Sequence, residues 1–287
     1  MASEASNASR MDVRGRLMYA GSFSGRARLD TQTPANNNLV LEPHRMSIRD
    51  VRPSRTSYTL DEHGFAFVKH QSEAATDPAL PEVSHPRQML PVGPAARYST
   101  EMLEFVREYT GATLVLPQIG SFIARASKPA TTWTPTAMLV HMDYSTTSAN
   151  QFVQWTVAAC GTPAPRHSYF AFIQTWRALS PGPQDNSLCV CDGSSVQPED
   201  AVPIDAVTGP ADLPGKCFEF RLCRYRKGHS WYYLSNMEAD DVVFFKGYDS
   251  RYPNAMSAMH SAFNNPLAGP DVAPRRSIEA RFLAFFT

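Results

Sequence analysis

The sequence predicts a mainly β fold, namely a double-stranded β-helix (jelly roll) with flanking helices and an N-terminal arm. Two observations favour this class. Downstream of residue 112, short runs rich in aromatic and β-branched residues are separated by Pro and Gly, which predicts roughly eight or nine strands. Few segments have helical periodicity, and a two-sheet jelly roll encloses such a set of strands around a site for a small ligand.

The N-terminal part of the chain predicts little regular structure. Residues 1–10 are expected to be disordered, and residues 16–60 are polar and rich in turn residues, which indicates an extended arm. Residues 64–70, GFAFVKH, have the composition of a strand. Residues 72–96 carry several prolines and are expected to form a loop of the kind that often covers an enzyme site.

Two helices are expected in the remainder. From Ser99, apolar residues such as Met102 and Val106 recur at helical spacing until Gly111, and this stripe is expected to pack against the barrel. Residues 146–165 are expected to be helical at their centre and to bridge two strands. The later strands are expected at residues 113–119, 122–126, 137–143, 168–179, 187–192, 217–225, 231–236, 241–249 and 278–286.

Length and composition suit an enzyme of ordinary globular type. The 287 residues are 43% hydrophobic and 19% charged, and no linker divides them, so residues 11–287 are expected to form a single domain. The 27 basic and 27 acidic residues cancel, which argues against a nucleic-acid partner. No apolar run is long enough to span a membrane, MASEASNASR has no hydrophobic signal core, and the odd number of cysteines argues against a disulfide framework. We therefore expect a cytoplasmic location.

Three residues could hold one metal ion. If residues 137–143 form a strand, His141 and Asp143 leave the same face and can bind one cation together. His260, far downstream, is the expected third ligand. His-x-Asp pairs also arise by chance among 8 histidines and 27 acidic residues, so the conjunction with the residues that follow carries the argument. Two imidazoles and one carboxylate form the facial triad of non-haem Fe(II) oxygenases, which leaves three coordination positions open.

A co-substrate site is expected close to this triad. In such oxygenases 2-oxoglutarate binds the iron through its keto-acid end, and its far carboxylate needs a buried cation. Arg275-x-Ser277 follows His260 and, on a strand, would aim a two-pronged donor and a hydroxyl at one carboxylate. Arg281 shares that strand face and is a substitute anchor. Alternation along residues 168–179 is expected to put Thr175 and Arg177 on one strand face and Gln174 and Trp176 on the other. If it faces inward, Arg177 is a further candidate for co-substrate or substrate binding, and an equally good alternative is that it pairs with Asp185 or Asp192.

The wider text resembles a known family. Residues 231–250 (WYYLSNMEADDVVFFKGYDS), the segment around His260 and Arg275-x-Ser277-Ile278-Glu279, with the N-terminal LDEHGFAFVKHQS, are similar to one Fe(II)/2-oxoglutarate-dependent oxygenase family. This family includes the cephem 7-methoxylase component, gibberellin desaturase-like proteins and the fungal novofumigatonin endoperoxide-forming oxygenase. The segment LPQIGSFIARAS, before the expected metal-binding strand, is more apolar than the resemblance predicts.

The resemblance implies Fe(II) and 2-oxoglutarate as cofactors, dioxygen as oxidant and a C–H bond of a fungal secondary metabolite as the target. The substrate is expected to be apolar, of the terpenoid or meroterpenoid kind, and the outcome to be hydroxylation, desaturation or endoperoxide formation. Apolar residues of the expected covering segments add some support, and they are Phe65, Phe67, Met89, Leu90, Ile119 and Phe122. Two alternatives stay open, a zinc-dependent hydrolase and a non-catalytic jelly-roll partner subunit. A homodimer is also left open.

Overall fold

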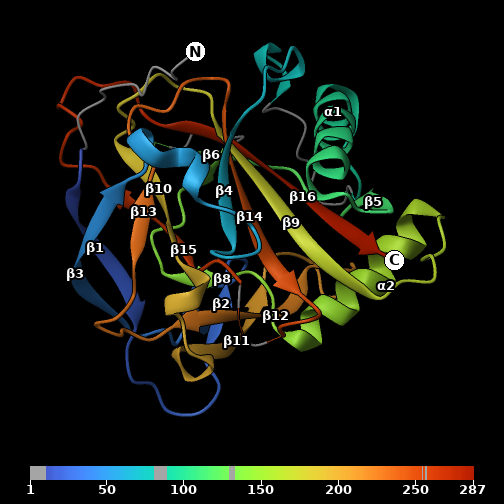
Figure 1. Cartoon of the computed structure of the whole chain (residues 1–287). Coiled ribbons are helices and arrows are strands. Elements are labelled where there is room, and N and C mark those ends of the chain that lie inside the picture. The colour runs from blue at the N-terminus through green and yellow to red at the C-terminus, as the bar shows by residue number, and fades with distance from the viewer. Residues whose placement is uncertain (1–10, 81–88, 129–132, 254, 256) are drawn as a thin grey trace.

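Two curled β-sheets form the body of the protein (Figure 1). The computed structural model describes residues 11–80, 89–128, 133–253, 255 and 257–287. The expected disorder of residues 1–10 and part of the expected loop 72–96 lie outside these residues. In the described ranges, one sheet has nine strands in the order β1 (Val13–Ala20), β3 (Leu41–Asp50), β13 (Trp231–Tyr233), β10 (Asn186–Cys191), β15 (His260–Asn264), β8 (His141–Met142), β12 (Cys217–Cys223), β11 (Ala201–Val207) and β2 (Arg28–Asp30).

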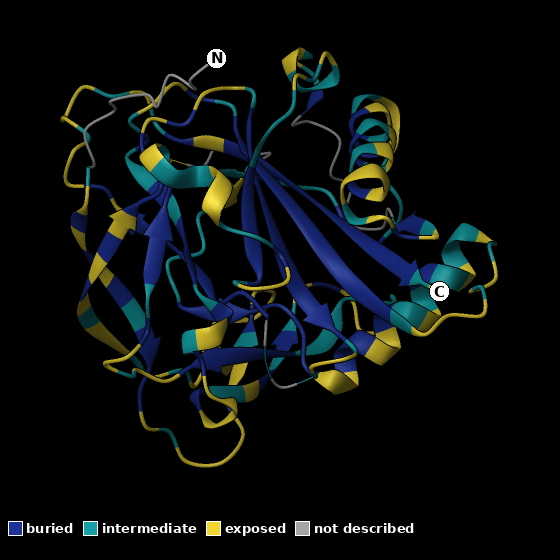
Figure 2. Ribbon diagram, in the orientation of Figure 1, coloured by how far each residue is buried: buried dark blue, intermediate teal, exposed yellow. Residues whose placement is uncertain are grey.

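The other sheet has seven strands in the same described ranges and carries most of the core. Its order is β4 (Phe65–Lys69), β14 (Asp241–Asp249), β9 (Tyr169–Ala178), β16 (Arg276–Phe286), β6 (Ile123–Ala126) and β7 (Thr134–Pro135), with β5 (Leu114–Pro117) paired to the far end of β16. Strands β9, β14 and β16 are buried along almost their whole length (Figure 2). All three segments were predicted as strands from their content of aromatic and β-branched residues.

The two helices of the described chain pack on opposite faces of the seven-stranded sheet, the first on its outer face and the second on the inward face beside Phe170 and Phe172. Helix α1 (Gly93–Thr110) lays Tyr98, Met102 and Val106 on that sheet. It begins earlier than the expected Ser99 and ends, as expected, at Gly111, whose left-handed backbone at φ 69° suits glycine. Helix α2 (Thr146–Cys160) also lies where a helix was expected, and the Ser145 side chain caps its first turn. In the part of the chain that the structure describes, no helix is long and apolar enough to cross a membrane.

The segment expected to be an arm is instead built into the nine-stranded sheet. Strands β1 and β3 pair along eight residues, and β3 continues the sheet through β13. In β1 buried and exposed residues alternate, with Val13, Leu17 and Tyr19 facing the core. This corrects the picture of a separate appendage. The alternation is visible in the sequence, but the arginines between the apolar residues make the segment polar on average.

The short 3₁₀ helices fill the connections between these elements. They are η1 (Pro34–Asn36), η2 (Arg52–Ser57), η3 (Ala74–Thr76), η5 (Gly193–Ser195) and η6 (Pro198–Asp200). The jelly-roll class predicted from the strand count is confirmed. What matters for function is that β8 and β15 of one sheet face β6, β9 and β16 of the other, because the polar residues of these strands enclose one pocket.

Candidate metal centre

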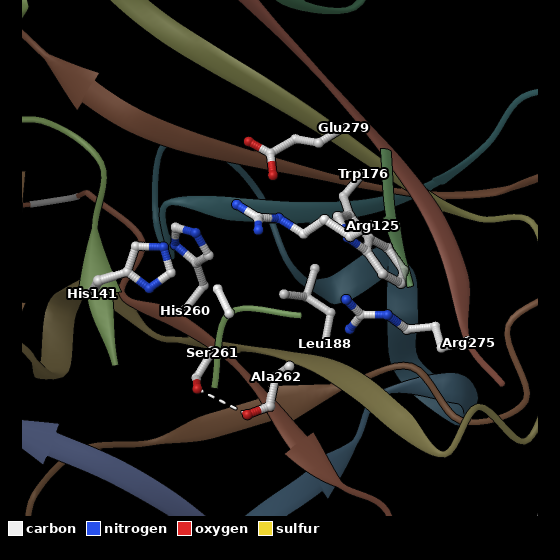
Figure 3. A pocket seen from close by; sticks show the side chains of 10 residues that line it. Arg125, His141, Trp176, Leu188, His260, Ser261, Ala262, Arg275 and Glu279 are labelled. Atoms are coloured by element: carbon white, nitrogen blue, oxygen red, sulfur yellow. Dashed lines mark hydrogen bonds between the residues drawn. The ribbon is translucent and has the colours of Figure 1, made fainter. Parts of the chain in front are cut away.

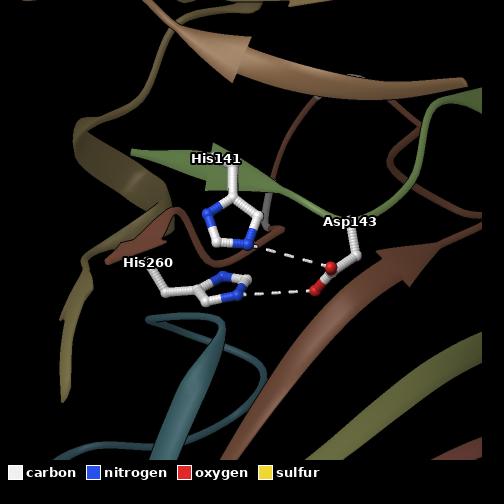
Figure 4. A group of neighbouring side chains, drawn as sticks. All are labelled: His141, Asp143 and His260. Atoms are coloured by element: carbon white, nitrogen blue, oxygen red, sulfur yellow. Dashed lines mark ion pairs between the residues drawn. The ribbon is translucent and has the colours of Figure 1, made fainter. Parts of the chain in front are cut away.

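His141, Asp143 and His260 come together at the centre of the nine-stranded sheet (Figure 4). His141 begins β8 and His260 begins β15, and the two residues are direct partners in the antiparallel pairing of these strands. The His260 Nε2 atom lies 3.4 Å from Asp143 Oδ2, and His141 Nε2 lies 3.9 Å from Asp143 Oδ1. All three residues are buried. Two imidazole nitrogens and a carboxylate therefore surround one small volume.

The local backbone differs from the expectation. Residues 137–143 were expected to form a strand, but β8 contains only His141 and Met142, and Asp143 lies in the bend that follows. The strand ends because Ser145 already caps helix α2. The two side chains still converge, so the predicted pairing of His141 with Asp143 holds although its regular strand is short.

Backbone carbonyls orient both imidazoles. The Nδ1 atom of His141 lies 2.8 Å from the Leu139 carbonyl oxygen, and Nδ1 of His260 lies 3.2 Å from that of Ala258. Because a carbonyl only accepts, each Nδ1 carries the proton and each Nε2 presents a lone pair towards Asp143. Burial lowers the pKa of His141 to about 4, so this ring is neutral at neutral pH. Neutral imidazoles with free Nε2 atoms are what a divalent metal needs.

The Asp143 carboxylate accepts from one protein donor at each oxygen. Gln174 Nε2 donates to Oδ2 at 2.6 Å, and Arg281 Nη2 donates to Oδ1 at 3.0 Å. Burial alone would raise the pKa of Asp143, but the adjacent Arg281 guanidinium outweighs it, and the pKa lies well below its usual value. Asp143 is therefore an anion, as a metal ligand must be.

A pocket adjoins the two histidines and is closed by the opposite sheet (Figure 3). Its charged residues are Arg125 from β6, Arg275 just before β16, and Glu279 from β16. Trp176 of β9 and Leu188 of β10 supply apolar walls. The pocket thus joins the candidate metal ligands to two guanidinium groups.

Arg275 is buried without a full set of partners. Its side chain is 1% exposed, and Nη1 donates to the Asn186 carbonyl at 2.7 Å, whereas Nε has no partner. Within the described residues no carboxylate forms an ion pair with it, and its guanidinium carbon lies 5.4 Å from the Trp176 ring centroid. Burial, with the nearby Arg125, lowers the pKa of Arg275 to about 9. The buried Ser277 hydroxyl also lacks a partner. Such groups are costly unless a ligand satisfies them.

Arg177 lies elsewhere, and its suggested place in co-substrate binding is corrected. Alternation in β9 was expected to put Gln174 and Trp176 on one face and Arg177 on the other, and this is the case. The pocket, however, lies on the Trp176 face. Arg177 points towards α1 and donates to the carbonyls of His70 and Ala239 and to Tyr98 Oη. It pairs with neither Asp185 nor Asp192 in the described chain.

The apolar residues expected to line the cavity pack into the core instead. Phe65 and Phe67 join a cluster around Trp176 and Phe245. The others pack against α1 or α2, and they are Met89, Leu90, Ile119 and Phe122. Among the described residues none of the six lines the pocket beside the histidines.

The sequence did not predict the positions that four residues have at this site, and these residues are Arg125, Gln174, Glu279 and Arg281. One signal for them exists, because Arg275, Ser277, Glu279 and Arg281 repeat a polar side chain at every second position of β16. Arg281 was noted as sharing that face, but its partner Asp143 was not foreseen. The neighbours Arg125 and Gln174 follow only from the pairing of β16 with β6 and β9.

Comparisons with known proteins agree with this site. A family model described as "Oxidoreductase/YMDC permease-like domain" matches residues 21–285. The Fe(II)/2-oxoglutarate-dependent dioxygenase nvfI of Aspergillus novofumigatus is 30% identical over 256 residues, which cover 88% of this chain and 87% of that protein. The hydroxylase/desaturase efuI of Hormonema carpetanum is 28% identical and covers 83% of this chain and 82% of its own length.

A solved structure shows the same fold. It is that of the iron and alpha-ketoglutarate-dependent endoperoxidase NvfI, with a TM-score of 0.79 and 25% identity, and it covers 96% of this chain and 98% of the other. The polar residues that gather between the two sheets therefore lie in a fold shared with an iron enzyme. The chain belongs to the family of Fe(II)- and 2-oxoglutarate-dependent dioxygenases.

Proposed function

We propose that His141, Asp143 and His260 hold the iron of this dioxygenase. The observation that carries this proposal is the convergence of two imidazoles and one carboxylate beside a pocket with a buried, incompletely paired arginine. The donor set fits Fe(II), because two nitrogens and one oxygen on one side of the ion leave its other positions open for small ligands. A zinc hydrolase would leave the arginine without a role, and family membership sets that alternative and the non-catalytic partner aside.

We further propose that Arg275 and Ser277 bind the far carboxylate of 2-oxoglutarate. A carboxylate would satisfy the free Nε of Arg275 and the free hydroxyl of Ser277 together. Arg125 carries a second guanidinium in the same pocket. Its Nη1 donates to the Pro135 carbonyl, and no carboxylate of the described residues forms an ion pair with it. Two cations without an ion-pair partner in the described residues favour a dianion over a neutral ligand.

When bound, iron and 2-oxoglutarate would supply the oxidation with dioxygen as oxidant: one oxygen atom would enter the succinate that forms with carbon dioxide, and the other would accept the hydrogen atom taken from the substrate. The chain contributes position and environment. His141 and His260 keep their Nε2 atoms directed at one point through the bonds of Nδ1. Trp176 and Leu188 supply apolar surface between the histidines and the two arginines.

The substrate that we propose is a mainly apolar secondary metabolite of the terpenoid or meroterpenoid kind. Support comes from the relatives, which are named a dioxygenase, a hydroxylase/desaturase and an endoperoxidase. The pocket offers little to the ammonium group of a free amino acid. Among the described residues Glu279 is its one carboxylate, and the Arg281 guanidinium already forms an ion pair with Oε1 of that carboxylate.

Release of succinate from 2-oxoglutarate tests the proposal. With Fe(II) and dioxygen, the wild-type protein should form succinate, faster when its substrate is added from a panel of terpenoids. His260→Ala should abolish succinate formation, and His167→Ala, at an exposed position, should leave it unchanged. Turnover that persists in His260→Ala, or that runs on zinc without consuming 2-oxoglutarate, would overturn the proposal.

A further inference from the structure

Four buried side chains form a closed ring that includes the proposed iron ligand Asp143. Arg281 donates from Nη2 to Asp143 Oδ1 at 3.0 Å and from Nε to Glu279 Oε1 at 2.5 Å. Gln174 donates from Nε2 to Asp143 Oδ2 at 2.6 Å and to the same Glu279 oxygen at 3.0 Å. Glu279 is thus joined to both donors of Asp143, one at each carboxylate oxygen.

Strand pairing makes this ring rigid. Arg281 of β16 lies directly opposite Gln174 of β9, and Glu279 lies opposite Trp176, so the ring members share the inward face of two neighbouring strands. Strand β14 shifts its register between Lys246 and Tyr248, and Gly247 there lies against the Gln174 amide and Tyr144. A side chain at Gly247 would collide with both, which shows how closely the Gln174 amide is enclosed.

The charges of the four ring residues favour the binding of a divalent cation at Asp143. A divalent cation bound by Asp143 shares this carboxylate with the Arg281 guanidinium, and two cations on one anion repel each other. Glu279 gives Arg281 a second anion on its other edge. With Glu279 present, two carboxylates face one guanidinium, and the ring keeps a net negative charge for the metal. Without Glu279, Asp143 and Arg281 would form a neutral pair.

We propose that Glu279 is a positioning residue of the iron site, which holds Arg281 and Gln174 in place and offsets the Arg281 charge so that Asp143 keeps its affinity for a divalent cation. This inference rests on the proposed role of Asp143. Glu279 is not proposed as a ligand itself. Among the described residues, the potential ligand atoms that lie within 4.8 Å of one another at this site belong to His141, Asp143 and His260.

The test measures metal affinity without turnover. Mn(II) binding to the metal-free, full-length protein is followed by equilibrium dialysis in the absence of 2-oxoglutarate. Glu279→Gln keeps the size of the side chain and removes its charge, and it should weaken Mn(II) binding about tenfold or more. Glu104→Gln, at an exposed glutamate far from any group of candidate metal ligands in the described chain, is the matched control and should bind Mn(II) like the wild type. Mn(II) affinity of Glu279→Gln within twofold of the wild type would overturn the inference.

A double substitution separates charge compensation from a merely structural role. Arg281→Met should bind Mn(II) at least as tightly as the wild type, because the competing cation is gone. In that background Glu279→Gln should change the affinity by less than about threefold, since nothing is left to offset. A loss of tenfold or more in the double variant, relative to Arg281→Met, would contradict the inference, and this comparison stands even if Glu279→Gln alone does not fold.

One further variant separates this inference from the proposed iron site. If the wild type binds Mn(II) and His260→Ala does not, the metal site stands whatever Glu279 does. If the wild type fails to bind, or His260→Ala binds equally well, then the proposed site falls and Glu279 loses its role with it.

Discussion

Two buried arginines of the seven-stranded sheet differ in how completely the protein satisfies their hydrogen-bond donors. Arg177 and Arg275 are both 1% exposed. Arg177, on the outer face of β9, donates to two backbone carbonyls and to Tyr98 Oη. Arg275, on the inner side, has one carbonyl partner for its side chain and an Nε without any. A buried guanidinium that the protein satisfies itself stabilises the fold, whereas one that it leaves incomplete is kept for a ligand.

The same substitution at the two arginines should therefore have opposite consequences. Arg275→Met should raise the 2-oxoglutarate concentration needed for half-maximal binding about 30-fold or more, since loss of one partner of a buried charge pair costs about 2–5 kcal/mol. Thermal stability without ligand should be equal or higher, because an incompletely paired cation is removed. Calorimetric titration of the Mn(II)-loaded protein measures the affinity for 2-oxoglutarate. An unchanged affinity would indicate that Arg281 or Arg125, and not Arg275, binds the far carboxylate.

Arg177 and Arg275 also show how much of the site can be predicted from the sequence alone. Alternation along β9 correctly separated Arg177 from Trp176, but it does not say which face is inward. That depends on β16, whose pairing partner β9 lies about a hundred residues earlier, and no local pattern records such a contact. Arg275, which lines the pocket beside the two histidines, could be associated with the triad because its position after His260 and the hydroxyl two residues later are local features of the sequence.

The same contrast between local sequence features and long-range strand pairing applies to other parts of the molecule. The apolar strands β9, β14 and β16 and the capped helix α2 were predictable because their composition and punctuation are local. Strands β1 and β3 were missed, since many of their side chains are exposed and the arginines among them make both segments polar on average. Glu279 was noted only as part of a family-like segment, and its bonds to Gln174 and Arg281 appear only when the two strands are paired.

Arg177→Met should act on the fold and not on the co-substrate. The carbonyls of His70 and Ala239 would lose their charged donor, and the free energy of unfolding should fall by about 2–4 kcal/mol. At a temperature where the variant is folded, its affinity for 2-oxoglutarate should match that of the wild type. Urea denaturation and the calorimetric titration together check this. A large loss of 2-oxoglutarate affinity with unchanged stability would reverse the comparison.

Binding of 2-oxoglutarate should stabilise the wild-type protein through Arg275. At a concentration one hundred times the dissociation constant, a ligand that binds only the folded state adds about 2.7 kcal/mol. The melting temperature of the Mn(II)-loaded wild type should rise by several degrees, and that of Arg275→Met by a third as much or less at the same concentration, because a 30-fold weaker ligand adds only about 0.9 kcal/mol. The Arg177→Met variant should show the wild-type increment from its lower starting point. An equal increment in all three proteins would show that neither arginine binds the co-substrate.

Ser277→Ala should give the smallest effect. The hydroxyl is neutral and would add one hydrogen bond to the carboxylate held by Arg275, which is worth about 1 kcal/mol. We expect roughly a fivefold loss of 2-oxoglutarate affinity, with stability unchanged or slightly higher because the buried hydroxyl has no partner. Ser187→Ala, at a buried serine whose hydroxyl donates to the Gln184 carbonyl, is the control and should leave co-substrate binding unaffected.

A crystal structure with Mn(II) and 2-oxoglutarate tests the central claim most directly. Anomalous scattering at the manganese edge locates the metal, and the electron density locates the co-substrate. The structure presented here predicts one metal bonded to His141 Nε2, His260 Nε2 and Asp143, with the far carboxylate of 2-oxoglutarate on Arg275 and Ser277. A metal bound away from these three residues, or a carboxylate on Arg177 with Arg275 still unpaired, would contradict the account.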